Sequence, residues 1–418
     1  MKPYLTLALF SLLVSFTSAE DWPEFRGPTG QGHSSAQGLP LTWSPSENVV
    51  WKVATPGVGW SSPIVIDGII FITSAVPEGE DGPEVDRSLR TLALDATTGA
   101  ILWNVEVFSQ KSATAPRVHK KNSHASPTAI WEEGKVYVHF GHQGTACLNA
   151  ADGAILWKNR EHPYKPVHGN GSSPIIVGDL LVFSADGGEN PGIIALDKAT
   201  GQTRWKTART SDAKRKFSFS TPLAIEVEGE TQIISPGSGM VAGLNPVDGS
   251  EIWRFNYDQG YSVVPRPIHA HGLIYLATGY DKPRCLAIRT GGKGDVTETH
   301  LAWEQDKYAP HNPSMVVVGD EFYMVADNGL LSCLDAKNGD VHFQERCTGP
   351  ISASILHADS RLYLIDERGT CAVVEPGKAL KILTTNHLDE RVLASPAVVD
   401  HDLIIRTEQH LYRISASR

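Results

Sequence analysis

Long apolar runs are scarce in this 418-residue sequence, and beyond residue 19 none approaches the ~18 residues that a membrane-spanning helix needs. Charged residues make up only 20% of the chain, and the net charge is -10. This balance argues against a general nucleic-acid binder. The sequence also has no C-x-x-C-H haem-attachment motif and no two adjacent cysteines. We therefore expect no transmembrane segment after the first residues and no nucleic-acid partner.

Cysteine is sparse as well, with five residues in the chain. Four of them occupy one position of a repeat, six residues before a predicted turn glycine: Cys147, Cys285, Cys333 and Cys371. Other copies hold alanine or glycine there, as at Ala93. Equivalent positions of different repeats lie too far apart for a disulfide, which needs Cα atoms within about 7 Å. We predict buried free thiols.

The first nineteen residues have the pattern of a secretory signal peptide. Lys2 precedes the apolar run LTLALFSLLVSF, which is followed by the small residues TSA. We expect cleavage after Ala19 and a mature protein that is periplasmic or secreted. No cysteine follows the predicted cleavage site, so a lipid anchor is not indicated.

The rest of the chain repeats one phrase, punctuated by glycine and proline. ALDATTGAILW at residues 93–103 returns as CLNAADGAILW at residues 147–157. Each copy begins with a small residue and a proline, then forms a hairpin such as SSPIVIDGIIFITSA, whose Asp-Gly is typical of a two-residue turn. A second hairpin follows, with a tryptophan in its last strand. The copies are 41 to 64 residues apart and start at Pro63, Pro127, Pro174, Pro222, Pro267, Pro313, Ser354 and Pro396.

Four short strands in a period of forty-odd residues predict the blade of a β-propeller. We expect an all-β, eight-bladed propeller of four-stranded antiparallel blades over residues 47–418, after an extension at residues 20–46. The eighth copy ends before its tryptophan position, whereas NVVWKVA near the mature N-terminus supplies Trp51 with no blade before it. We expect this strand to complete the last blade and close the ring, which removes the open ends of a linear array.

The repeat ALDATTGAILW resembles the pyrroloquinoline-quinone (PQQ) type repeats of quinoprotein-like eight-bladed propellers, over residues 47–414. The phrase DWPEFRGPTGQG at residues 21–32 resembles the N-terminal phrase of exported bacterial members of unassigned role. That superfamily includes PQQ-dependent alcohol dehydrogenases and the propeller lipoprotein of the outer-membrane β-barrel assembly machinery. The resemblance implies the fold, which by itself leaves the function open. PQQ-dependent dehydrogenases of the family carry two adjacent cysteines, which this chain lacks.

Three links between predicted blades, at residues 108–125, 158–171 and 206–219, are rich in basic residues. Against two acidic residues they carry Lys111, Arg117, Lys120, Lys121, Lys158, Arg160, Lys165, Lys206, Arg209, Lys214, Arg215 and Lys216. We call these twelve residues the basic arc. Since all such links emerge on one face of a propeller, this segregation predicts a site for an anionic ligand or partner. The alternative is that these side chains only aid solubility.

The residues just before each inner strand are predicted to surround the channel mouth. The candidate ligand-binding residues there are Trp60, His124, His168, Asn170, Tyr261, Arg266, His311, Asn312 and Arg391. Aromatic, imidazole, amide and guanidinium groups in one ring suit a planar anionic or polyhydroxylated ligand. The alternative for each is a hydrogen bond to unpaired backbone at a strand start.

Three functions remain open at this point. The first is an exported, non-catalytic propeller, expected to be a monomer, that binds an anionic small molecule, a glycan or a protein. The second is a quinoprotein oxidoreductase that uses PQQ with Ca²⁺. The third is a hydrolase or lyase of an anionic glycan with His124, His168 or His311 as acid or base. We favour the first and predict no metal site, because the paired histidines of HAHG and HFGH have no evident third ligand.

Overall fold

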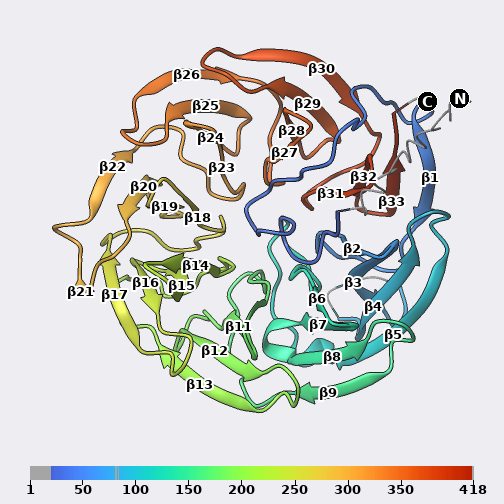
Figure 1. Cartoon of the computed structure of the whole chain (residues 1–418). Coiled ribbons are helices and arrows are strands. Elements are labelled where there is room, and N and C mark those ends of the chain that lie inside the picture. The colour runs from blue at the N-terminus through green and yellow to red at the C-terminus, as the bar shows by residue number, and fades with distance from the viewer. Residues whose placement is uncertain (1–19, 81, 83, 417–418) are drawn as a thin grey trace, which may run out of the picture.

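The computed structural model describes residues 20–80, 82 and 84–416, and it places eight antiparallel sheets around a central axis (Figure 1). The predicted all-β, eight-bladed propeller is confirmed. The predicted signal peptide lies outside the described residues. Within them, the helices are two short 3-10 turns, η1 (Ser112–Thr114) and η2 (Gly141–Gln143), and no helix has the length and apolar character to cross a bilayer.

The first strand of each blade lines the channel, and the second pairs with it. The innermost strands are β2 (Ile64–Ile66), β6 (Ile130–Glu132), β10 (Ile175–Val177), β14 (Leu223–Val227), β18 (Ile268–Ala270), β23 (Val316–Val318), β27 (Leu356–Ala358) and β31 (Ala397–Val399). The second strands are β3 (Ile69–Pro77), β7 (Lys135–His139), β11 (Leu180–Ser184), β15 (Glu230–Gly237), β19 (Leu273–Ala277), β24 (Glu321–Val325), β28 (Arg361–Ile365) and β32 (Asp402–Arg406).

The third and fourth strands of each blade lie toward the outside of the ring. The third strands are β4 (Arg87–Asp95), β8 (Thr145–Asn149), β12 (Gly192–Asp197), β16 (Met240–Leu244), β20 (Cys285–Arg289), β25 (Leu330–Asp335), β29 (Thr370–Glu375) and β33 (His410–Ile414). The outermost strands are β5 (Ile101–Gln110), β9 (Ile155–Asn159), β13 (Thr203–Ala208), β17 (Glu251–Asn256), β22 (Leu301–Gln305), β26 (Val341–Arg346), β30 (Lys381–His387) and β1 (Val49–Ala54).

The ring is closed by strand β1, which pairs antiparallel with β33, so Val49 lies opposite Ile414. The two ends of the propeller therefore belong to one blade, as the position of Trp51 predicts. An ion pair supports the closure: Nζ of Lys52 on β1 lies 2.8 Å from a carboxylate oxygen of Glu390, which precedes β31.

The recurrent turn explains why the phrase repeats. In ALDATTGAILW, the Asp95 carboxylate accepts the backbone N–H of Thr98 at 2.7 Å, and Gly99 adopts a φ of +74°. A side chain on Gly99 would come within 3.0 Å of Trp51, whose indole N–H donates to the carbonyl of Ala96 at 3.0 Å. The tryptophans of β5, β9, β13 and β22 make the equivalent bond to the next blade. Each copy thus holds the blade before it.

The fifth blade departs from this rule. Its third and fourth strands are joined by a longer segment, and β21 (Gly294–Asp295) within it pairs parallel with β17 of the fourth blade. Since the usual turn is missing, Trp253 donates its indole N–H to Gln232 of its own blade at 2.9 Å.

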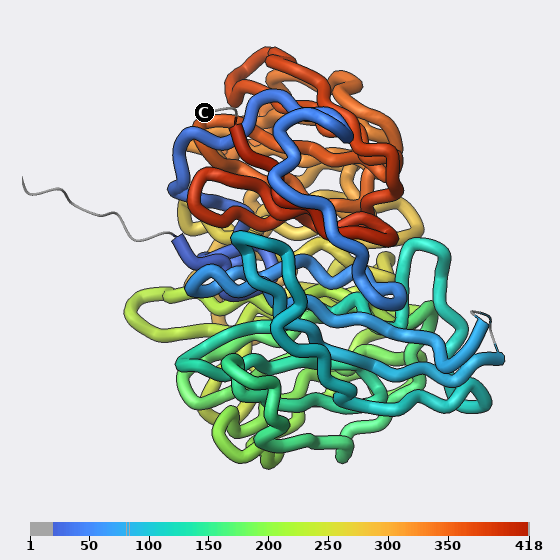
Figure 2. Tube along the Cα trace, turned by 90° about the vertical axis from the view of Figure 1, so that its right-hand side faces the viewer, coloured from blue at the N-terminus to red at the C-terminus, as the bar shows by residue number. Residues whose placement is uncertain are grey.

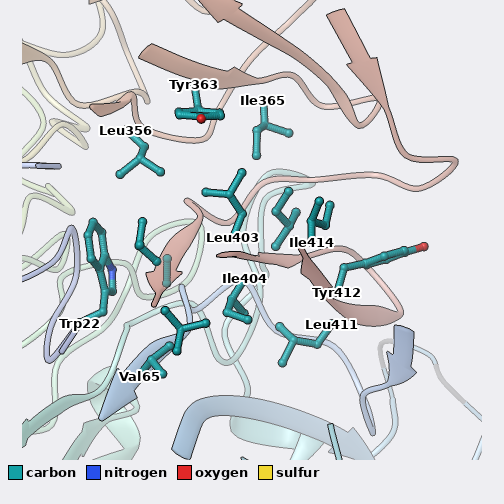
Figure 3. Close-up of a cluster of buried hydrophobic side chains, with 14 of the residues drawn as sticks. Trp22, Val65, Leu356, Tyr363, Ile365, Leu403, Ile404, Leu411, Tyr412 and Ile414 are labelled. Carbon is teal, nitrogen blue, oxygen red and sulfur yellow. The ribbon is translucent and has the colours of Figure 1, made fainter. Parts of the chain in front are cut away.

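The extension before β1 crosses one face of the ring. In the edge-on view its dark-blue start lies on the left, opposite the long β3–β4 hairpin on the right (Figure 2). Trp22 exchanges two backbone hydrogen bonds with Val65 of the first blade, and Gly32 accepts one from His357 of the seventh. The Trp22 side chain is 1% exposed and belongs to the apolar cluster that joins blades seven, eight and one (Figure 3). The extension is therefore part of the folded ring.

The cysteine prediction is also confirmed. All five cysteines are buried and free. Burial raises the pKa of Cys147 to about 11, so this thiol stays protonated and unreactive at neutral pH.

Candidate functional site

The two faces of the ring differ. The extension covers the face that carries the hairpins between first and second strands, which we call the extension face. The opposite face carries the links between blades and is called the link face. A cavity of about 190 Å³ lies on the axis. Phe25 of the extension lines it, as do Trp60, His168 and Asn312 from before the inner strands.

A belt of hydroxyl groups forms the wall of this cavity. Seven of the eight blades supply it with a serine or threonine at the start of the repeat: Ser62, Thr128, Ser173, Thr221, Ser314, Ser354 and Ser395. Most of these oxygens accept the backbone N–H of the preceding blade, for example that of Ser62 by Thr128 and that of Thr128 by Ser173, both at 2.9 Å. The hydroxyl residue at the start of each of these repeats thus joins neighbouring blades around the channel.

Arg266 takes the belt position of the fifth blade, and its side chain leaves the channel for the extension. It is 1% exposed, its Nη1–H donates to the carbonyl of Phe25 at 2.7 Å, and Nη2 lies 3.0 Å from a Glu24 carboxylate oxygen. Burial raises the pKa of Glu24 although Arg266 opposes the shift. Among the predicted mouth residues, Arg266 therefore lies elsewhere, and in this structure it anchors the extension.

Six rings in edge-to-face or tilted contact follow the rim of the mouth on the link face. This aromatic collar consists of His119, His168, Phe217, Tyr261, Tyr280 and His311. Successive ring centroids lie 4.6 to 6.1 Å apart, within the range of favourable aromatic pairs. Burial, followed by the charge of His168, lowers the pKa of His119, so that ring is neutral at pH 7. The collar spans blades two to six.

The link between β5 and β6 crosses the mouth toward the opposite blades. Nζ of Lys121 lies 2.7 Å from Glu367 of the seventh blade and 3.6 Å from Asp327 of the sixth. Arg391, before the eighth blade, donates to the carbonyl of Lys120 at 2.7 Å. The guanidinium of Arg391 also lies 5.6 Å from the centre of the Trp60 ring. The rim is thus tied across the axis.

Asp327 organises the sixth-blade side of the rim. Its carboxylate accepts the backbone N–H of His311 at 2.7 Å and the side-chain amide of Asn312. Burial alone would raise the pKa of Asp327, but these bonds and the His311 ring outweigh it and lower that pKa. Asp327 is therefore ionised at neutral pH and balances the charge of Lys121.

The predicted mouth residues divide into two groups. Trp60, His168 and Asn312 line the cavity, and Tyr261, His311 and Arg391 contact residues that do. The other three predicted residues belong neither to the lining nor to the collar and its cation contacts. They are Arg266, half-buried His124, and Asn170, which is buried against Tyr164 and His142. His119 and Tyr280 were missed, because one lies inside a link and the other in a hairpin, away from the repeat position that led to the prediction.

The basic arc is less uniform than its sequence suggests. Lys111, Lys121 and Lys165 form ion pairs with acidic residues of neighbouring hairpins. Arg209 is buried against Asp186 at 2.8 Å. Counting charges within links alone missed these partners. Among the described residues, eight exposed cations of the arc form no ion pair: Arg117, Lys120, Lys158, Arg160, Lys206, Lys214, Arg215 and Lys216. The guanidinium of Arg215 lies 4.9 Å from the centre of the Tyr261 ring in the collar.

The cavity lining does not fit PQQ with a metal ion. PQQ is a tricarboxylate, yet Lys121 is the one Lys or Arg among the described lining residues, and two carboxylates already neutralise it. In the described part of the chain, no group of three or more His, Cys, Asp or Glu side chains is placed to hold a cation. His168 and His311 lie at separate points of the collar with three rings between them, so they do not form an acid–base pair.

Comparison with known proteins agrees with this architecture. The PQQ_2 family model, described as outer membrane protein assembly factor BamB, matches residues 89–299 and 295–407. The chain belongs to this family. The PQQ_2 match spans most of the blades that the repeat predicts.

Relatives of this PQQ_2 member have different names. BamB of Yersinia pestis is 23% identical, over 76% of this chain and 86% of that protein. The polyvinylalcohol dehydrogenase of a Sphingopyxis species is 24% identical, over 57% of this chain and 42% of the enzyme. The crystal structure of BamB from Moraxella catarrhalis has a TM-score of 0.60, covering 88% of this chain and 98% of that one. A europium-containing methanol dehydrogenase reaches 0.69, covering 92% and 89%. Both structures are 12% identical in sequence and show the fold alone.

Proposed function

We propose that this protein is an exported, non-catalytic binding propeller that holds an anionic ligand or partner on its link face. The observation that carries the proposal is the aromatic collar together with the eight exposed cations of the basic arc that, among the described residues, form no ion pair. Cations that have no carboxylate of their own attract an anion without first breaking an internal pair. Because the extension covers the other face, a ligand reaches the axis from the link face.

The relatives support binding more than catalysis for this chain. Several are named outer membrane protein assembly factors, which is consistent with an exported protein that engages a partner. Others are named quinone or polyvinylalcohol dehydrogenases. A PQQ-dependent dehydrogenase would need unpaired cations for the cofactor and carboxylates for its metal ion, and the described lining residues offer neither.

The test is retention of the mature protein on a sulfated, anionic matrix. The triple variant Lys214→Glu, Lys216→Glu and Arg215→Glu should elute at a much lower salt concentration than the wild type. Salt elutes the protein because it screens the attraction between the cations and the matrix, over about 8 Å at physiological concentration, and the variant has less of this attraction to screen. The matched control reverses Lys293, Lys378 and Arg289, three exposed cations at the extension-face ends of third strands or in the segments that follow them; within the described residues none of the three forms an ion pair. If both triple variants lose retention equally, net charge explains binding and the proposal fails.

A titration with PQQ and Ca²⁺ tests the alternative that the protein is a PQQ-dependent dehydrogenase. A ligand that binds only the folded state at a hundred times its Kd stabilises it by about 2.7 kcal/mol. We expect no change in thermal stability with PQQ and Ca²⁺ at micromolar to millimolar concentration. A clear stabilisation would refute our interpretation of the cavity lining.

A further inference from the structure

The cavity and its rim differ in chemistry. The wall is uncharged: each of six belt oxygens accepts a backbone N–H, and within the described residues none of these hydroxyls donates to a protein acceptor. Their hydrogens remain available to a ligand. The unpaired cations of the basic arc all lie outside the cavity lining, on the links and on the outermost strands β9 and β13. A ligand that matches both zones has a polar, uncharged end and acidic groups further along.

The entrance between these zones offers ring surfaces. Tyr280 is 48% exposed and lines the cavity, and the exposed residues His119 and His168 line it as well. Aromatic surfaces of this kind pack against the C–H face of a sugar ring, whose hydroxyls then point to the polar groups around it. The collar therefore suits a pyranose better than it suits an extended peptide.

The volume limits what enters. About 190 Å³ is several times the roughly 30 Å³ of a water molecule in the liquid. It admits one ring-sized group and excludes a folded domain. An acidic side chain in that space would be costly, because a buried carboxylate needs a cation and Lys121 is already neutralised by Glu367 and Asp327.

We propose that the ligand is an acidic glycan. Its uncharged terminal sugar enters the hydroxyl belt past Tyr280, while the carboxylates or sulfates of its other sugars lie on the exposed cations of the link face. The proposal rests on the function proposed above and names the class of ligand. An acidic peptide satisfies the cations but leaves the hydroxyl belt and the collar unused.

The experiment measures binding by calorimetry with four probes: a hyaluronan hexasaccharide, its methyl-esterified form, a heparosan hexasaccharide and hexaglutamate. Both acidic glycans end in an uncharged N-acetylglucosamine and carry carboxylates further along. We expect at least one acidic hexasaccharide to bind at least tenfold more tightly than hexaglutamate and than the methyl ester. Tyr280→Ala should weaken glycan binding at least tenfold. Tyr308→Ala removes a tyrosine of similar exposure (43%) outside the collar and should leave binding unchanged.

A cavity-filling variant separates the two proposals. Val264 is half-buried and lines the cavity, so Val264→Phe should abolish glycan binding while retention on the anionic matrix persists. If hexaglutamate binds as tightly as both acidic glycans, or if Tyr280→Ala and Val264→Phe have no effect, the glycan proposal is overturned and anion binding stands. If no anionic probe binds and the matrix does not retain the protein, both proposals fail.

Discussion

Replacing Arg266 by serine tests how the extension is held. Serine is the residue that other blades carry at this position, so the variant restores the repeat and offers a hydroxyl to the belt. It also removes the ion pair with Glu24 at 3.0 Å and the hydrogen bonds to the carbonyls of Phe25 at 2.7 Å and Pro222 at 3.0 Å. The repeat predicts a stabilising change, whereas the contacts predict a destabilising one.

The contacts should dominate. Breaking a buried ion pair from one side costs about 3–5 kcal/mol. A new hydroxyl hydrogen bond returns about 1 kcal/mol. The net loss is then about 2–4 kcal/mol. With an unfolding entropy of about 2.1 cal/mol/K per residue over roughly 400 residues, Tm should fall by about 2–5 °C.

The pH dependence of stability shows whether the loss in Arg266→Ser comes from the unpaired carboxylate of Glu24. Burial already holds the pKa of Glu24 above its usual value, and without Arg266 it should rise further. A raised carboxyl pKa in the folded state costs stability at high pH and less as pH falls through that pKa. The deficit of Arg266→Ser should therefore be largest at neutral pH and shrink on acidification.

Calorimetry and urea unfolding of three variants complete this test. Arg266→Ser combined with Glu24→Gln should recover part of the loss, because no carboxylate is left unpaired. Arg289→Ser, at an exposed arginine, should change stability by no more than about 0.5 kcal/mol. An Arg266→Ser protein as stable as the wild type at neutral pH would refute the assignment of Arg266 as an anchor.

Three further outcomes are expected. Burial alone would raise the pKa of Glu390, but hydrogen bonds from Lys52 and its neighbours lower that pKa to about 2. The stability advantage of the wild type over Glu390→Gln should therefore be complete above pH 4.5 and vanish as the pH falls through 2, which urea unfolding at a series of pH values measures. A thiol reagent should modify no cysteine of the native protein and all five after unfolding, and rapid reaction in native buffer would contradict their burial. Trp103→Phe, which loses a bond to the next blade, should be destabilised by about 1 kcal/mol, and so should Trp253→Phe, but only the first should be additive with Gln232→Ala.

The fold could be predicted from the sequence because every blade repeats the same pattern of strands and turns. Turn residues such as Asp95 and Gly99 act locally, and the same local solution recurs in successive copies. Ring closure was predictable too, since Trp51 stands without a blade of its own. Sequence periodicity thus reports the contacts that recur between one repeat and the next.

The site was less predictable because its contacts break the repeat. Tyr280 and His119 reach the collar from segments that have no counterpart elsewhere, and Lys121 pairs with Glu367, far along the chain. Arg266 occupies a mouth position yet turns away from the mouth, because the extension supplies Glu24. Nothing in the order of residues indicates which blades these segments will meet.

The pairing of β1 with β33 has a consequence for biogenesis. Strand β1 is synthesised first and pairs with β33, the last strand, so its edge stays unpaired while nearly the whole chain is synthesised. Closing so long a loop is entropically costly and slow. Until its final residues emerge, the nascent chain is therefore exposed to aggregation, and chaperones that shield strand edges should matter more for its yield than for a protein with local pairing.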